Sequence, residues 1–157
     1  MNANELRIGN LVYNCAQYCY VMSVYKNNKV EFGYFKDSIG FVRSLDNIEI
    51  QPIPITEEWL FKFGFEKIPN ESYINGNQWT LQVTGERHES GKINRDETWF
   101  DAIGDYSWIK EDGNKTMAVN VLCKGNYVCN SVKYIHQLQN LYFALTQTEL
   151  EIETLQV

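Results

Sequence analysis

The chain has 157 residues, of which 44% are hydrophobic and 14% aromatic, and its formal net charge is −6. This length suits one domain, or one domain with a small appended module, and the apolar share is too high for a disordered chain. The negative charge argues against general nucleic-acid binding and against docking on an anionic membrane, because both need clustered Lys and Arg.

The N-terminal segment is polar and lacks the apolar stretch of a secretory signal. No run of about 18 apolar residues occurs, so we expect no membrane-spanning segment and a cytoplasmic location. Without export, a disulfide framework is not expected. The spacings of the four cysteines also differ from the CxxC knuckles of zinc sites. We therefore predict buried thiols, no metal and no cofactor for Cys15, Cys19, Cys123 and Cys129.

The first 55 residues read as short strands separated by turns. Gly9 stands where a strand begins or bends, and Asn27–Asn28 tolerates the positive φ of a tight hairpin. Strands are predicted over 6–13, 19–25, 29–34, 41–44 and 48–50. Together they favour a small SH3-like barrel or a curled sheet as a first module, residues 1–55.

A proline-rich connector, residues 52–56, ends this sheet because proline removes backbone donors. Thr56 is a natural N-cap, and Glu57 and Glu58 complement the helix dipole in the first turn. Gly64 is a C-terminal stop. The pattern predicts a short helix over 57–63 whose apolar side chains, Trp59, Leu60 and Phe63, belong to the core.

The remaining chain alternates again at period two and then becomes helical. Strands are predicted over 78–83, 98–103, 106–109 and 117–122. Apolar residues then recur at three- and four-residue steps, which predicts a helix over about 134–145. The fold class is therefore α+β, mainly antiparallel, with residues 56–157 forming a second module packed on the first in one compact unit.

Polar residues on the last helix have two interpretations. Gln137, Gln139 and Asn140 either face a partner, such as a second copy of the chain, or satisfy backbone groups of a sheet. His136 invites a catalytic role, but no nucleophile elbow, HExxH pair or paired-carboxylate motif accompanies it. We expect it instead to cap the helix or to hydrogen-bond to a strand, and we predict no enzyme and no catalytic residues.

Three segments carry a family resemblance. Glu5-Leu-Arg-Ile-Gly-Asn-Leu-Val12, Ile53-Pro-Ile-Thr-Glu-Glu-Trp-Leu-Phe-Lys-Phe-Gly-Phe65 and Tyr134-Ile-His-Gln-Leu-Gln-Asn-Leu-Tyr-Phe-Ala-Leu145 occur in this order. They resemble uncharacterised small proteins from phages and prophages of Bacteroides-group bacteria. The resemblance implies an accessory phage-type protein in the cytoplasm of a bacterial host. It implies no catalytic or binding residue, and residues 66–130 have no counterpart in it.

The most unusual stretch is residues 84–98, a long polar segment between two strands that carry tryptophans. It holds two of the four arginines of the chain. Arginine offers a planar fork for phosphate, and tryptophan offers a face for a base. A solvated hairpin loop is the plainer interpretation, since acidic residues balance the basic ones. The residues of the candidate ligand site are Trp79, Arg87, His88, Lys92, Arg95 and Trp99.

Two functions follow as hypotheses. The first is sequestration of a small anionic nucleotide, such as a signal of host antiviral defence, by the segment 84–98 and its flanking tryptophans. The second is an adaptor or inhibitor that binds a host protein through the β module and the C-terminal helix. Tyr13, Tyr18, Tyr20 and Tyr25 favour the second, because aromatic grooves of SH3-like barrels bind peptides.

Overall fold

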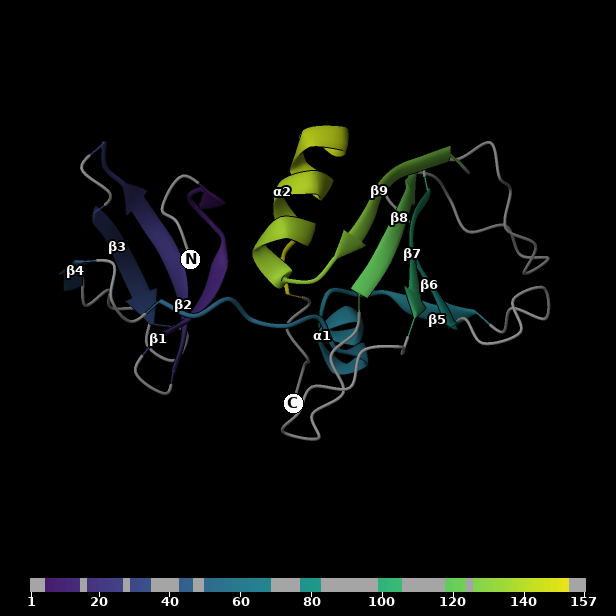
Figure 1. The fold of residues 1–157 in the computed structure, drawn as a ribbon, viewed down its shortest axis with the longest axis horizontal. Helices are drawn as coiled ribbons and strands as arrows, with labels where there is room; N and C mark the ends of the chain where they lie inside the picture. The colour runs from purple at the N-terminus through teal and green to yellow at the C-terminus, as the bar shows by residue number, and fades with distance from the viewer. Residues whose placement is uncertain are drawn as a thin grey trace.

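The computed structural model describes residues 5–14, 17–26, 29–34, 43–46, 50–68, 77–82, 99–105, 118–123 and 126–152. In this part of the chain, two antiparallel sheets flank a pair of helices (Figure 1). The predicted α+β class is therefore confirmed. No helix among the described residues has both the length and the apolar composition needed to cross a membrane.

The first sheet has four strands in the order of the sequence, each antiparallel to the next. The pairing of β2 with β3 confirms the predicted hairpin around residues 25–30. Among the described residues β1 and β4 do not pair, so the strands form an open sheet and no closed barrel is seen. The strands are β1 (Leu11–Asn14), β2 (Gln17–Val24), β3 (Lys29–Tyr34) and β4 (Arg43–Asp46).

The second sheet has five strands, also in sequence order and antiparallel. Three of them match predicted strands, whereas the first and the last were not predicted. The strand predicted over 106–109 lies outside the described residues. The strands are β5 (Glu66–Ile68), β6 (Asn77–Gln82), β7 (Trp99–Asp105), β8 (Ala118–Cys123) and β9 (Asn126–Val132).

A tight turn precedes β1, at the glycine where the sequence predicted that the strand over 6–13 begins or bends. The Asn10 amide donates to the Arg7 carbonyl at 3.0 Å, and Gly9 has φ +90°, as the third residue of a type II turn requires. The Gly9 amide donates to Val21 O at 2.8 Å, and the Val21 amide donates to Asn10 O at 2.9 Å. Gly9 and Asn10 together thus oppose the single residue Val21, so the turn ends in a β-bulge against β2 with glycine as its first residue.

Helix α1 (Glu57–Lys62) confirms the predicted short helix to within one residue. The Trp59 amide donates to the Thr56 hydroxyl oxygen at 3.3 Å, so Thr56 caps the helix as its side chain allows. Gly64 follows with φ +81°, a left-handed conformation that ends a helix at little cost in glycine.

Helix α2 (Ile135–Thr146) confirms the predicted C-terminal helix and lies between the two sheets (Figure 1). Successive side chains of strand β1 belong to two different hydrophobic clusters. Val12 belongs to a small cluster within the first sheet, whereas Leu11 belongs to a larger one with α1, α2 and the second sheet. Strand β1 therefore joins the two halves of the molecule.

Candidate functional site

Trp79, proposed as a stacking face, lies in the core. It is 0% exposed on β6 and belongs to the larger cluster. Its ring is therefore closed to a ligand, and its predicted stacking role is wrong. Period-two alternation marked Trp79 as facing one side of a sheet but could not tell which side was covered. Arg87, His88, Lys92 and Arg95 lie outside the described residues.

Two described residues flank the segment 84–98 in the sequence. Gln82, the last residue of β6, pairs with Trp99, the first residue of β7. Cys123, the last residue of β8, lies at the same end of the sheet, because it pairs with Phe100. Near that end, the side chain of Tyr127 on β9 is 59% exposed.

Strand β2 concentrates exposed apolar side chains at the opposite side of the molecule. Tyr18 and Met22 are each 42% exposed, and Val24 and Tyr25 are also exposed. Ile8, in the turn before β1, is exposed beside the same strand, because its neighbour Gly9 is bonded to Val21. Exposed apolar side chains gathered in one place are typical of interaction surfaces, whereas scattered ones are ordinary.

Tyr18 is exposed yet held in place by other rings. Its ring meets Tyr13 edge-on at 5.3 Å and Trp59 edge-on at 5.0 Å between centroids. Trp59 is buried and lies 6.0 Å from Phe63, and the Lys62 ammonium lies 4.8 Å from the Trp59 ring centroid. Edge-to-face contacts at these distances are favourable. Tyr18 is thus an aromatic side chain fixed by helix α1 but open to solvent.

Tyr25 directly follows β2 and has a polar partner on β3. A hydrogen bond to the Glu31 carboxylate raises the pKa of the Tyr25 hydroxyl, and a hydrogen bond with Ser23 opposes this. Of the four tyrosines singled out in the sequence, Tyr18 and Tyr25 are exposed. Tyr13 and Tyr20 are partly buried and pack against the larger core.

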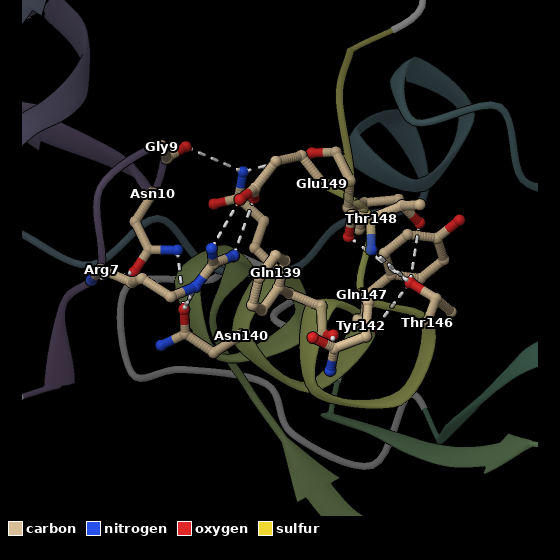
Figure 2. Close-up of polar contacts among 12 residues, drawn as sticks. Arg7, Gly9, Asn10, Gln139, Asn140, Tyr142, Thr146, Gln147, Thr148 and Glu149 are labelled. Atoms are coloured by element: carbon tan, nitrogen blue, oxygen red, sulfur yellow. Dashed lines mark hydrogen bonds and ion pairs between the residues drawn. The ribbon is translucent and has the colours of Figure 1, made fainter.

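The polar residues of α2 bind backbone groups of the N-terminal segment (Figure 2). Gln139, 3% exposed, accepts from the Leu11 amide at 2.8 Å. Its own amide donates to Gly9 O at 3.3 Å and to Leu150 O at 3.4 Å. The interpretation of Gln139 as satisfying a sheet's backbone is therefore confirmed, and Gln139 offers nothing to a partner.

Asn140 continues this network toward the surface (Figure 2). Its side-chain oxygen accepts from Asn10 Nδ2 at 2.9 Å and from Arg7 Nε at 3.4 Å. Its amide donates to Glu5 O at 2.9 Å. Arg7 also forms a two-bond pair with Glu149, at 2.6 and 2.8 Å, and this bond lowers the pKa of the Glu149 carboxyl. We call Arg7, Asn10, Gln139, Asn140 and Glu149 the α2 joint.

Gln137 serves the start of helix α2 instead. Its side-chain oxygen accepts from the amides of Lys133 at 3.1 Å and Tyr134 at 3.3 Å. These donors lie directly before the helix, so Gln137 performs the capping that was expected of His136.

His136 departs from its prediction, because among the described residues it neither caps the helix nor bonds to a strand. It is 1% exposed, and in the described part of the chain neither ring nitrogen has a hydrogen-bond partner. The ring stacks on Tyr134 with 5.9 Å between centroids, and Nε2 lies 4.0 Å from the Glu5 carboxylate. Burial lowers the pKa of the imidazole, and the nearby Glu5 charge opposes that shift.

Three cysteines within the described ranges are free thiols, and Cys19 is buried as predicted. Cys123 and Cys129 are half-buried, and Cys15 lies outside the described residues. Across those ranges, no group of three His, Cys, Asp or Glu side chains is placed to hold a metal ion.

Comparison with protein-family models, with curated proteins and with solved structures finds no match for this chain.

Proposed function

We propose that this chain is a phage-type accessory protein that acts by binding a host protein, without catalysis, through β2 of its N-terminal sheet. The observation that carries the proposal is that the Tyr18 ring is exposed and yet fixed in its orientation. It is 42% exposed, yet two rings hold it edge-on. The phage setting rests on the sequence resemblance alone.

A fixed and exposed tyrosine suits protein recognition for two reasons. The ring brings a large contact area together with a hydroxyl that can form hydrogen bonds. Its rotamer freedom is already restricted by Tyr13 and Trp59, so little entropy remains to be lost on binding. Met22 and Tyr25, farther along the same chain segment, and Ile8, in the turn beside it, add further exposed apolar area. Tyrosine is also among the residues enriched at binding hot spots.

The SH3-like character of the N-terminal module is part of this proposal. Gln51 follows β4 in the chain and returns to β1, where its amide donates to Tyr13 O at 2.8 Å and its carbonyl accepts from Tyr13 N at 3.0 Å. A chain that returns to the first strand in this way supports a barrel-like closure. SH3-like modules bind peptides along aromatic side chains, which agrees with a role for Tyr18.

The test is capture of a host protein by the immobilised chain, compared between two matched variants. Tyr18→Ser removes the fixed ring from β2. Tyr127→Ser removes an exposed ring from β9 of the other sheet and is the control. Melting temperatures of both proteins are measured first, because Tyr18 also packs against Trp59.

Loss of a hot-spot side chain costs about 2 kcal/mol or more, roughly a 30-fold weaker Kd. We expect this loss for a stoichiometric partner with Tyr18→Ser and with Tyr25→Ser, and an unchanged Kd with Tyr127→Ser. Equal binding by all variants would refute the proposed surface. Light scattering of the purified chain separates a second copy of the chain from a host protein as the partner.

A second candidate function is sequestration of a small anionic nucleotide near the segment 84–98. The pairing of Gln82 with Trp99 favours it, because the described residues on either side of the arginine-containing segment face each other across β6 and β7. Tyr127, exposed near that end, can supply the stacking face that the buried Trp79 cannot.

A thermal-shift screen with cyclic dinucleotides, cyclic ADP-ribose variants and mononucleotides tests this second function. Arg87→Ala and Arg95→Ala are each expected to weaken binding by about tenfold or more, as for a charge-assisted hydrogen bond. Arg43→Ala, on β4 of the other sheet, is the control with the same chemical change. No shift with any nucleotide would eliminate this function.

A further inference from the structure

An apolar ring would fill the site of His136 equally well, so packing alone does not explain an imidazole there. The ring is closed from solvent in the first turn of α2, stacks on Tyr134, and has no hydrogen bond to any described residue. A neutral imidazole carries one donor and one acceptor, and leaving them unpaired in a dry site is unfavourable. The feature that distinguishes histidine from an apolar ring here is its ability to take up a proton.

Glu5 is the acidic group within reach. Its carboxylate oxygen lies 4.0 Å from His136 Nε2 and is mostly exposed. Its backbone carbonyl accepts from Asn140 Nδ2 at 2.9 Å. His136 and Asn140 are one helical turn apart, so both meet the same residue of the N-terminal segment. The imidazole is therefore in direct contact with the segment that the α2 joint holds.

We propose that His136 is a pH-sensitive switch: its protonation loosens the hold of helix α2 on the N-terminal segment Glu5–Leu11. An imidazolium needs acceptors or water at both nitrogens. Glu5 can approach Nε2, but the closed packing offers Nδ1 no acceptor among the described residues. Hydration of Nδ1 therefore requires the first turn of α2 to separate from its surroundings.

The charges around the ring set the direction. The groups whose charge acts on it are the Glu5 carboxylate, which favours protonation, and the N-terminal amino group, which opposes it. Arg7 of the same segment is bound to Glu149. Burial is the largest effect and lowers the pKa of His136, so the folded form takes up its proton at a lower pH than the open form. Acid therefore favours opening.

The consequence reaches β2, although the switch does not depend on the proposed function. The segment Glu5–Leu11 includes the turn whose Gly9 amide is bonded to Val21. Ile8, exposed in that turn, lies beside the proposed partner surface. Loosening the segment at mild acid thus changes the edge of that surface.

The first measurement is an NMR titration of the imidazole protons. The chain has two histidines, His88 and His136, so His136 is the only histidine in the His88→Gln variant. We expect its midpoint below the ordinary value of about 6.5. Glu5→Gln in the same background should lower the midpoint further. A midpoint at or above 6.5, or one that does not respond to Glu5→Gln, would overturn the proposal.

The second measurement is amide hydrogen exchange of Leu11, whose amide is bonded to Gln139 across the joint. The full chain and His136→Phe are compared at each pH from 7.5 to 5. The ratio of the Leu11 exchange rate in the full chain to that in His136→Phe should rise by up to about tenfold per pH unit below pH 6.5. The same ratio for amides of β7 and β8 should stay constant. A pH-independent ratio at Leu11 would refute the switch. If His136→Phe does not fold, Leu11 is compared between the His88→Gln chain and its Glu5→Gln derivative, in which loosening should begin at the same pH but continue to lower pH and become larger.

Discussion

Arg7 and Glu149, 142 residues apart in the sequence, form a two-bond ion pair above the ring of Phe143. The guanidinium carbon lies 3.9 Å from the centroid of that ring. Glu149 approaches Gly9 as well, since a Cβ on that glycine would lie 3.6 Å from its carboxylate. The pair therefore closes the outer end of the α2 joint.

Glu149→Gln should lower the free energy of unfolding by about 1 kcal/mol or less, because the pair is partly exposed. Glu58→Gln removes a more exposed pair with Lys62 within α1 and should cost less. Arg7 lowers the pKa of Glu149, so this stabilisation is complete above the ordinary carboxyl pKa of about 4.3. It is lost as pH falls through the lowered value. Urea unfolding of both variants at pH 7 and pH 3 checks the costs and their pH dependence, and a difference for Glu149→Gln that is undiminished at pH 3 contradicts the assignment.

Gln139→Leu should destabilise the protein by about 1–3 kcal/mol, because the Leu11 amide and two carbonyls lose a buried partner. Gln137→Leu, two residues earlier on an exposed position, should cost less, since water can bind the released amides. Denaturant unfolding of the two variants measures the difference. Equal costs would mean that the joint is hydrated in solution.

Gly9→Ala should cost about 1–2 kcal/mol, because φ is +90° and an L side chain is strained there. Gly33→Ala tests steric crowding by a neighbouring side chain instead of backbone strain. A Cβ at Gly33 would meet Met22 Sδ at 2.9 Å, but Met22 is exposed and flexible enough to move away. Thermal unfolding should therefore show a larger loss for Gly9→Ala. The opposite order would contradict the turn geometry.

His136→Phe should leave stability at pH 7.5 unchanged or raise it. The substitution keeps a planar ring against Tyr134 and removes two buried polar atoms that lack partners among the described residues. Calorimetry at pH 7.5 checks this, with His136→Ala as the cavity-forming comparison. A loss of several kcal/mol for the phenylalanine variant would indicate a hydrogen bond at the ring in solution.

The sequence predicted the elements whose formation depends on residues that are close to one another in the chain. Helix α1 followed from Thr56 and Gly64, whose roles depend on neighbours in the chain. Strands β5 and β9 escaped prediction because they lack the alternation of a half-buried strand. Strand β9 carries exposed residues on both faces until Val132, and β5 has three residues.

The joint itself could not be predicted, because its partners lie 128 to 142 residues apart. Gln139 and a surface glutamine look alike in a sequence, and only the approach of Leu11 makes one of them structural. The three segments that carry the resemblance lie next to one another in the structure. Glu5–Val12 and Tyr134–Leu145 meet at the joint. The Ile135 amide at the start of α2 donates to Ile53 O, and the Ile55 amide donates to Lys133 O just before the helix.

The separation of Arg7 from Glu149 also constrains the order of folding. The joint cannot close until the chain has been synthesised through residue 149, and loops of that length close slowly. During that interval the first sheet can rely on its own small cluster around Val12, Val21 and Phe32. Leu11, which later belongs to the larger core, remains uncovered until α2 arrives. A nascent chain that stalls before residue 135 would therefore expose this face to chaperones or to aggregation.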